Sequence, residues 1–383
     1  MSRTPLLCIA GGGTGGHVMP ALALADAARV QWPQLRVCFV GAERGLEATL
    51  LPQRGEQVQL LTMHGVKGAG LLQRLRVLLW ELPSAVVAIR RAWKTERPDV
   101  LVGVGGYASI AAVVAALISR VPVILYEQNA MPGLVNRTLA RFSSTMMLGF
   151  AAANQHLSQR IHRMVTGNIV RESIANTRWQ THAPARLLVL GGSQGARVLN
   201  QTVPQACQLL AREGRNFTVS HIVGADPTTL DTVRAMYAEA DIKAEVLPFC
   251  EDMASFYGSG TLMVARAGAM TVSESACCGL PSLFVPLPHA ADDHQRHNAN
   301  TLAEAGAAMV LDQQSLNPES LAGHIEKLLF DTDALNQMSQ AAVAKAPYDA
   351  RQKQLQVLAD YLPGLFIETA STLNDAQKSG VSA

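Results

Sequence analysis

The sequence predicts an α/β protein with two domains, each built on a parallel sheet. The same order of an apolar run, a glycine turn and a helical pattern occurs twice along the chain. The composition, 49% hydrophobic and only 16% charged, suits strands that are buried on both faces between helices. A chain of 383 residues also exceeds what one hydrophobic core usually serves.

The two units begin in the same way. Residues 6–10 form a short apolar run that leads into the glycine-rich turn 11–16 and then a helical pattern. The order returns at 187–190, with glycines at 191–195 and another helical stretch. Further apolar runs alternate with helical patterns, as in parallel βα units, at 37–40, 100–102, 121–125, 246–247, 262–264 and 283–285.

We expect a first domain at 1–165 and a second at 166–342, with a hinge near Val165-Thr166-Gly167. A C-terminal helix at about 343–362 is expected to pack back on the first domain, and 369–383 to form a disordered tail. Parallel sheets bind ligands beyond the carboxyl ends of their strands, so the predicted active site is a cleft between the domains.

Charge and cysteine usage exclude several classes. The net charge of +2 is too mild to indicate a nucleic-acid partner. The six cysteines lack C-x-x-C spacing, so neither a disulfide framework nor a zinc ribbon is indicated, and a reducing cytosol fits best. The start does not read as a secretory signal, and the weakly polar stretch 105–119 falls short of the ~20 residues of a membrane span.

Glycines directly after a strand let the backbone approach an anion, and the following helix start presents N–H groups to it. The turns at 11–16 and 191–195 therefore predict phosphate binding, with a merely structural turn as the alternative. A nicotinamide enzyme, with Glu43 on a ribose, is disfavoured because the spacing is not a clean G-x-G-x-x-G. The kinase-type loop G-x-x-x-x-G-K-[ST] does not occur.

A further strand-to-helix junction carries the richest polar cluster, at 266–274. Gly268 permits close approach, the N–H groups of Ala269 to Thr271 can face a phosphate, and Glu274 can accept hydrogen bonds from ribose hydroxyls. An ordinary capping box formed by Thr271 and Glu274 is the structural alternative.

Six ordered segments closely resemble the MurG family of peptidoglycan N-acetylglucosaminyltransferases, over about residues 5–360. They are Gly12 to His17, Gly103 to Tyr107, Glu127 to Asn129, Gly191 to Arg197, Arg266 to Glu274 and Asp293 to Ala299. The resemblance implies a GT-B fold, with two Rossmann-like domains whose parallel sheets face a deep cleft. It also implies an inverting hexosyltransferase that moves N-acetylglucosamine from UDP-N-acetylglucosamine to the 4-hydroxyl of the muramyl sugar of lipid I, giving lipid II.

In that family the second domain holds the donor, so the resemblance places Phe249 against the uracil, the backbone of Cys250 at its edge and Glu274 on the ribose. Further donor contacts are implied for Arg171, Ser193, Arg266, Ala269, Met270, Thr271, Val272, Ser273 and Gln295. From the first domain, donor contacts are implied for Thr14, Gly15, Gly16 and Asn129. Acceptor-side positions are Gly105, Gly106, Tyr107, Glu127 and His294.

The transfer needs a base for the attacking hydroxyl and a partner for the charge that develops on UDP. His17 is the candidate base, since an imidazole with a pKa near 6.5 is largely neutral in the cytosol; a helix-start histidine bonded to the backbone is the structural alternative. No D-x-D motif occurs, and helix starts with Arg266 can carry the leaving-group charge. We expect no cofactor, no obligatory metal and no zinc site at His289, His294 and His297.

The stretch Lys67 to Trp80 combines basic residues with leucines and a tryptophan, which suits docking on an anionic membrane surface. A core helix with a solvated basic face is the alternative. The resemblance favours a peripheral enzyme on the cytoplasmic face of the inner membrane, with lipid I as acceptor and cell-wall synthesis proteins as further partners.

Three positions depart from the family pattern: Tyr126 replaces a histidine, Ile169 replaces a proline, and Ile110-Ala111 lack one. These departures bear on the acceptor loop and the hinge. The alternatives left open are a GT-B transferase or epimerase with another UDP-sugar or acceptor, and a non-catalytic scaffold that binds nucleotide sugars.

Overall fold

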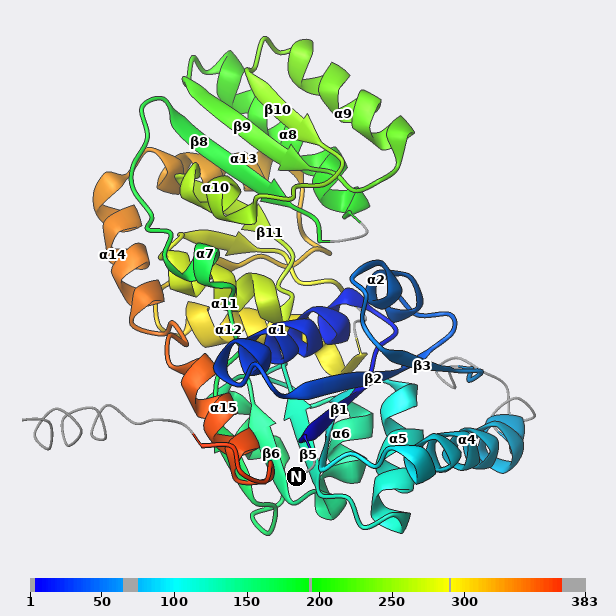
Figure 1. The fold of residues 1–383 in the computed structure, drawn as a ribbon. Coiled ribbons are helices and arrows are strands. Elements are labelled where there is room, and N and C mark those ends of the chain that lie inside the picture. The colour runs from blue at the N-terminus through cyan, green and yellow to red at the C-terminus, as the bar shows by residue number, and fades with distance from the viewer. Residues whose placement is uncertain (1–3, 65–74, 193–194, 289–290, 367–383) are drawn as a thin grey trace, which may run out of the picture.

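The computed structural model describes residues 4–64, 75–192, 195–288 and 291–366. Within these residues the chain forms two parallel sheets, one above the other in Figure 1. The strand orders are β3-β2-β1-β4-β5-β6-β7 and β10-β9-β8-β11-β12-β13. The predicted fold of two parallel-sheet α/β domains is thereby confirmed.

The strands follow the apolar runs of the sequence. In the first sheet they are β1 (Leu6–Gly11), β2 (Arg36–Ala42), β3 (Val58–Leu61), β4 (Val100–Gly105), β5 (Val123–Glu127), β6 (Thr145–Leu148) and β7 (Arg163–Val165). In the second they are β8 (Ala185–Leu190), β9 (Phe217–Ile222), β10 (Ala244–Leu247), β11 (Leu262–Ala265), β12 (Ser282–Phe284) and β13 (Ala308–Val310).

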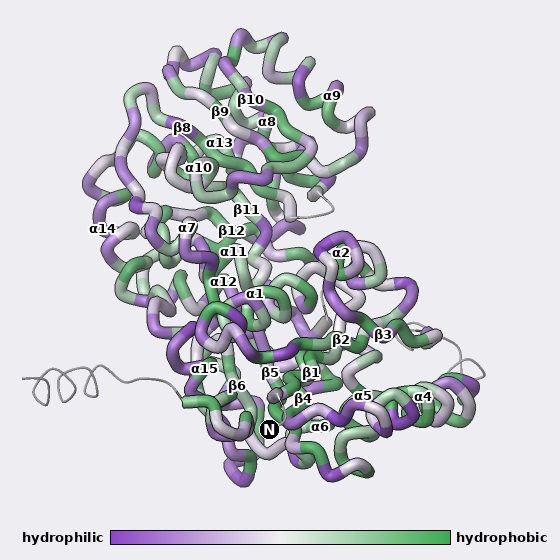
Figure 2. Tube along the Cα trace, viewed as in Figure 1, coloured by the Kyte–Doolittle hydropathy of each residue, from purple (hydrophilic) through white to green (hydrophobic). Residues whose placement is uncertain are grey.

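Helices cover both faces of each sheet. Those used below are α1 (Gly15–Gln31), α2 (Glu47–Gln53), α4 (Leu82–Thr95), α5 (Tyr107–Ile118), α7 (Glu172–Ala175), α11 (Ala269–Cys278), α12 (His294–Ala303), α14 (Thr332–Val343) and α15 (Ala350–Ala359). The strands are apolar because both of their faces are buried. In β1, Leu7 and Ile9 pack in one core, and Cys8 and Ala10 pack in another. Figure 2 shows these apolar strands enclosed by more polar helices.

The chain crosses between the sheets twice. It leaves the first sheet after β7, where Gly167 has a φ of +80°, and it returns between α14 and α15. Leu355 and Leu358 of α15 join the core of the first sheet. The helix expected at about 343–362 begins only at Ala350, because the chain turns at Pro347 after α14 has ended at Val343.

No helix in the described part of the chain is long and apolar enough to span a bilayer. The predicted tail at 369–383 lies outside the described residues.

Candidate active site

The turns that follow β1 and β4 interlock at the carboxyl edge of the first sheet. The N–H of Gly12 donates to the carbonyl of Gly105 at 3.3 Å. A Cβ on Gly11 would overlap that carbonyl, and one on Gly106 would lie 2.6 Å from the carbonyl of Gly12. Gly11, Gly105 and Gly106 all have positive φ. Only glycine fits such a contact, so two of the predicted acceptor-side residues help to build the turn beside His17.

His17 lies in the first turn of α1, half-buried, with Nδ1 3.1 Å from the carbonyl of Gly12. A carbonyl only accepts, so Nδ1 carries the proton of the neutral ring and Nε2 holds the free lone pair. A Cβ on Gly105 would lie only 3.0 Å from Nε2. Burial lowers the pKa of His17, and the charge of Glu127 opposes that shift. The ring is therefore neutral at neutral pH and can accept a proton at Nε2.

Glu127 ends β5, and its buried carboxylate organises the loop that follows. One oxygen accepts from the N–H and the side-chain amide of Asn129, at 3.0 and 3.1 Å. The other accepts from the N–H of Gly133 and from Nδ2 of Asn136, both at 2.9 Å. Four donors saturate the carboxylate, so its main contact in this structure is with its own loop.

The same loop touches the second domain through Asn298 of α12, which is fully buried. Its Oδ1 accepts from the N–H of Ala130 at 2.8 Å. Its Nδ2 donates to Oδ1 of Asn129 and to the carbonyl of Ala267, each at 3.1 Å. Asn298 was not predicted as a site residue, although it lies within the motif 293–299.

Asn168, in the first crossover, makes a similar bridge. Its Oδ1 accepts from the hydroxyl of Tyr126 at 2.9 Å. Its Nδ2 donates to the carbonyl of Gln128 and to Oγ of Ser273, at 3.0 and 3.1 Å. Tyr126, which departs from the family pattern, is fully buried and bonds Asn168, the residue that follows the predicted hinge.

The two domains meet around His17. His294, the first residue of α12, is close enough for its charge to lower the pKa of His17. Gln295 follows it, and its Oε1 accepts from the N–H of Leu287 at 2.9 Å. The structure thus brings the predicted base of the first domain close to a helix of the second domain that carries two predicted site residues.

Glu274 projects from α11, six residues after the N-cap Gly268, and is half-buried. The hydroxyl of Tyr257 donates to its Oε2 at 2.8 Å. Burial raises the pKa of Glu274, while this hydrogen bond and the charge of Arg171 lower it. Tyr257 was not predicted, because a residue 17 positions upstream on another helix leaves no spacing signal.

Phe249 is 68% exposed in the loop after β10, and the half-buried Cys250 follows it. An exposed aromatic ring is free to stack on a base. The charge of Arg171 acts on Cys250 as well as on Glu274. Three predicted donor residues from separate segments therefore lie in one neighbourhood.

Arg266 is turned into the protein. Its Nη1 donates to the carbonyls of Val285 and Pro286 at 2.8 and 3.1 Å, and its Nη2 donates to Oε1 of Gln313 at 2.6 Å. Burial lowers its pKa. The guanidinium ties β11 to the loop after β12, and its contact with a donor stays a prediction.

The remaining predicted donor residues lie in several places. Thr14 precedes α1 as its N-cap, and Gly15 and Gly16 form its first turn. Ala269, Met270 and Thr271 form the first turn of α11. Val272 and Ser273 are buried, and Oγ of Ser273 accepts from Asn168. Ser193 lies outside the described residues.

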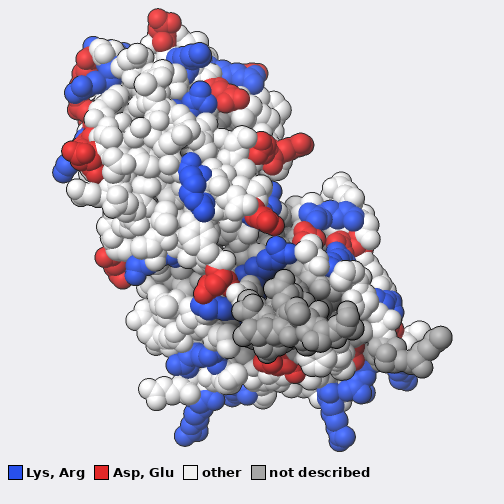
Figure 3. Space-filling view, turned by 60° about the vertical axis from the view of Figure 1, so that its left-hand side comes forward, with Lys and Arg blue, Asp and Glu red and all other residues white. Residues whose placement is uncertain are grey.

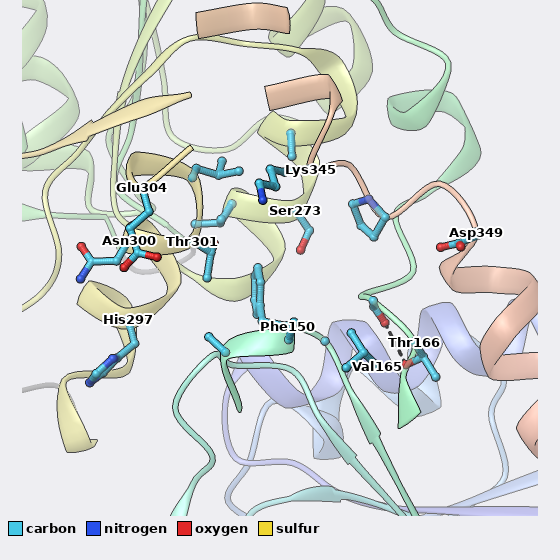
Figure 4. Close-up of a pocket in the computed structure, with 18 of the residues that line it drawn as sticks. Phe150, Val165, Thr166, Ser273, His297, Asn300, Thr301, Glu304, Lys345 and Asp349 are labelled. Atoms are coloured by element: carbon cyan, nitrogen blue, oxygen red, sulfur yellow. Dashed lines mark hydrogen bonds between the residues drawn. The ribbon is translucent and has the colours of Figure 1, made fainter. Parts of the chain in front are cut away.

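Val272 and Ser273 also line a cavity of about 570 Å³ at the hinge (Figure 4). Side chains from α12, from the crossover at Val165 to Gly167 and from the α14–α15 connection face it, Lys345 among them. The hinge cavity thus includes two of the predicted donor residues but not His17, Glu127 or Glu274.

In the described ranges no group of three or more His, Cys, Asp or Glu side chains is arranged to hold a metal ion. The expectation that no metal is obligatory stays a prediction.

Comparison with known proteins agrees with this geometry. Residues 7–148 match the glycosyltransferase family 28 N-terminal domain, and residues 186–354 match the family 28 C-terminal domain. A UDP-N-acetylglucosamine–N-acetylmuramyl-(pentapeptide) pyrophosphoryl-undecaprenol N-acetylglucosamine transferase from Syntrophotalea carbinolica is 40% identical over 92% of this chain and 97% of its own.

Solved structures give the same result. The crystal structure of Acinetobacter baumannii MurG matches with a TM-score of 0.76 and 30% identity, covering 93% of this chain and 99% of that one. A UDP-N-acetylglucosamine 2-epimerase matches with a TM-score of 0.62 over 94% of this chain and 95% of its own, at 15% identity. At that identity the epimerase shares the fold alone.

The chain combines two parallel-sheet domains with a glycine turn that carries His17 on one and a strand-to-helix junction that leads to Glu274 on the other. Together with the matches to both family 28 domains, these features define a glycosyltransferase of family 28 with the GT-B fold. Within that class the chain belongs to the MurG family of N-acetylglucosaminyltransferases.

Proposed function

We propose that this chain transfers N-acetylglucosamine from UDP-N-acetylglucosamine to the 4-hydroxyl of the muramyl sugar of lipid I, yielding lipid II. The observation that carries the proposal is the approach of His17 in the first domain to α12 of the second, with Glu274 and Phe249 presented by the same second domain. The names of the relatives support the choice of both substrates.

The donor is held by the second domain. Phe249 stacks on the uracil, and Glu274, oriented by Tyr257, accepts from ribose hydroxyls. The first turn of α11 presents N–H groups and the positive end of its helix dipole to the diphosphate. These groups stabilise the charge that develops on UDP as the sugar leaves.

The acceptor hydroxyl is activated by the first domain. Nε2 of His17 accepts its proton while the oxygen attacks the anomeric carbon from the face opposite UDP. The bond to UDP breaks as the new glycosidic bond forms, so a single displacement converts the α linkage of the donor into a β linkage. Because Nδ1 is bonded to the carbonyl of Gly12, the ring keeps its orientation when Nε2 is protonated.

UDP release from UDP-N-acetylglucosamine, with and without a lipid I analogue and in EDTA, tests this proposal. Acceptor-dependent release that persists in EDTA and is lost in His17→Ala supports a metal-independent transferase. Tight UDP binding without release, whatever acceptor is offered, would instead support the non-catalytic scaffold. Release with another acceptor only would point to a different GT-B transferase.

We further propose that the protein docks on the cytoplasmic face of the inner membrane. Residues 67–74 lie outside the described residues, but the next turn is described and exposes Leu78, Leu79 and Trp80, the last by 73%. Arg90, Arg91 and Lys94 of α4 are exposed beyond them. Apolar side chains beside basic ones suit the interface of an anionic bilayer. Figure 3 shows basic side chains projecting from the end of the first domain, at the bottom of the view.

Co-sedimentation with phosphatidylglycerol vesicles tests the docking surface. Leu79→Ser with Trp80→Ser should weaken binding by about tenfold or more, and neutral phosphatidylcholine vesicles should bind the wild type poorly. Val30→Ser, which removes another exposed apolar side chain of the same domain, is the control. If the wild type, the double variant and Val30→Ser all bind the vesicles equally, this surface does not dock on the membrane. Cell-wall synthesis proteins stay predicted partners.

A further inference from the structure

One peptide bond of the first glycine turn is held from both sides. The N–H of Gly13 donates to Oε2 of Glu47 at 2.7 Å. The carbonyl of Gly12, in the same peptide unit, accepts from Nδ1 of His17 at 3.1 Å. In a trans peptide the N–H and C=O point to opposite sides. The carboxylate, the peptide and the imidazole therefore form one hydrogen-bonded chain.

Glu47 is enclosed in a cradle made of glycines. Its side chain is 1% exposed, and its Oε1 accepts from the N–H of Ala42 at 2.9 Å. A Cβ placed on Gly12, Gly41 or Gly45 would overlap the Glu47 side chain. Glycines at three positions in two segments thus make room for one carboxylate. A buried ion needs such partners, because burial without hydrogen bonds is strongly unfavourable.

The buried Glu47 carboxylate changes which N–H groups of the glycine turn are available to an external phosphate. Glycine turns at a strand-to-helix junction bind external phosphates through their N–H groups, and that use was predicted for residues 11–16. Here the N–H of Gly13 is already given to an internal carboxylate. An external anion at Gly13 would have to displace Glu47 or lie against its charge. The phosphate-binding prediction is therefore wrong for Gly13, whereas the start of α1 at Gly15 and Gly16 is not engaged by Glu47.

We propose that Glu47 is a positioning residue of the active site: its carboxylate occupies the interior of the first glycine turn, fixes the Gly12–Gly13 peptide and, through that peptide, holds and polarises His17. A carboxylate on the N–H side makes the carbonyl a stronger acceptor. The carbonyl then stabilises the ring when Nε2 takes the proton of the acceptor hydroxyl. The arrangement acts like a carboxylate–histidine pair with one peptide inserted between its members.

Other charged groups also face His17. Glu127, from the end of β5, favours the protonated ring, and His294, from the start of α12, disfavours it. Glu47 acts in the same direction as Glu127 and is the smallest of these influences on the pKa of His17. Removal of the Glu47 charge should therefore lower the pKa of His17 while leaving Glu127 and His294 in place.

The test is Glu47→Gln, with Glu43→Gln as the matched control. Glu43 lies four residues upstream and loses the same charge, but it is exposed and bonded to Thr62. We expect the NMR titration midpoint of His17, read without substrates, to move to lower pH in Glu47→Gln and to stay in place in the control. The rate of sugar transfer at neutral pH should fall by about threefold to tenfold, with KM for UDP-N-acetylglucosamine unchanged. An unmoved midpoint in folded Glu47→Gln would overturn the proposal.

In Glu47→Gln the side-chain amide has only one accepting oxygen, so its NH₂ group would face the N–H of Ala42 or of Gly13. Two donors in contact are unfavourable, and the variant is at risk of unfolding. The wild type then supplies the test. In protein labelled with ¹⁵N-glycine, the amide resonance of Gly13 should titrate with the midpoint of His17 and lose that transition in His17→Gln. A Gly13 resonance that ignores His17 would overturn the link through the peptide. The proposal rests on His17 as base, but these titrations use no substrate, so failure of the transferase assay is a separate result.

Discussion

The hydroxyl of Tyr257 and Oε2 of Glu274 form a 2.8 Å hydrogen bond between two helices of the second domain. Tyr257 is 1% exposed, and burial raises its pKa well above the ordinary value, so it acts as a donor at all physiological pH. This bond orients the carboxylate proposed to bind the ribose.

Tyr257→Phe should weaken donor binding, because Glu274 would lose the partner that fixes its rotamer. We expect KM for UDP-N-acetylglucosamine to rise by about tenfold, equivalent to about 1.4 kcal/mol, with kcat little changed. Tyr237→Phe, an equally buried tyrosine of the same domain that bonds His221 instead, is the control. If both variants bind UDP alike in calorimetry, Tyr257 has only a packing role.

Activity should fall on the acid side as His17 becomes protonated. Burial lowers the pKa of His17 below its ordinary value near 6.5, and an imidazolium cannot accept the hydroxyl proton. The acid limb of kcat/KM should therefore lie below pH 6.5. His17→Gln should lose about 10²- to 10⁴-fold in kcat and bind UDP normally. A mutant that keeps both the rate and the acid limb would exclude His17 as the base.

His221 should make the second domain sensitive to acid. Its ring lies fully buried between the hydroxyl of Tyr237 and Oδ1 of Asn200, each at 3.0 Å, and burial lowers its pKa to about 3. The unfolded state takes up a proton near pH 6.5, whereas the folded state does so only near pH 3. Stability is therefore full above pH 6.5 and falls by about 1.4 kcal/mol per pH unit below it.

Denaturant melts between pH 7 and pH 4 test this slope. His221→Gln keeps a donor and an acceptor but does not titrate, so it should be less stable at pH 7 and show a shallower loss. Equal slopes in both proteins would assign the acid sensitivity to other groups.

Asn298→Asp should loosen the contact between the domains. The new carboxylate oxygen would face the Asn129 side-chain oxygen and the Ala267 carbonyl, which now accept from Nδ2. Two accepting contacts become repulsive, and we expect about 2–4 kcal/mol of destabilisation. Neighbouring Asn300→Asp, on the same helix and half-buried, is the control. Small-angle scattering should report a wider domain distribution for Asn298→Asp alone, and equal curves would contradict the bridge.

Local patterns were enough to predict the parallel sheets and most of their junctions. The apolar runs at Leu6 to Ala10 and Leu262 to Val264 became buried strands, and each glycine turn that followed opened a helix within the described residues. These features depend on burial, periodicity and the conformational freedom of glycine within a few consecutive residues. The membership of one family likewise followed from ordered motifs in the sequence.

The partners of the buried polar groups depended on the tertiary structure. Glu47 lies 34 positions from the N–H of Gly13 that it binds, and Asn298 lies 169 positions from Asn129. Arg266 was predicted from its place after a strand, and only the structure shows that its guanidinium bonds the carbonyls of Val285 and Pro286. A local pattern shows that a polar residue follows a strand, but its hydrogen-bond partner is set by which distant segments the packed sheets bring within about 3 Å.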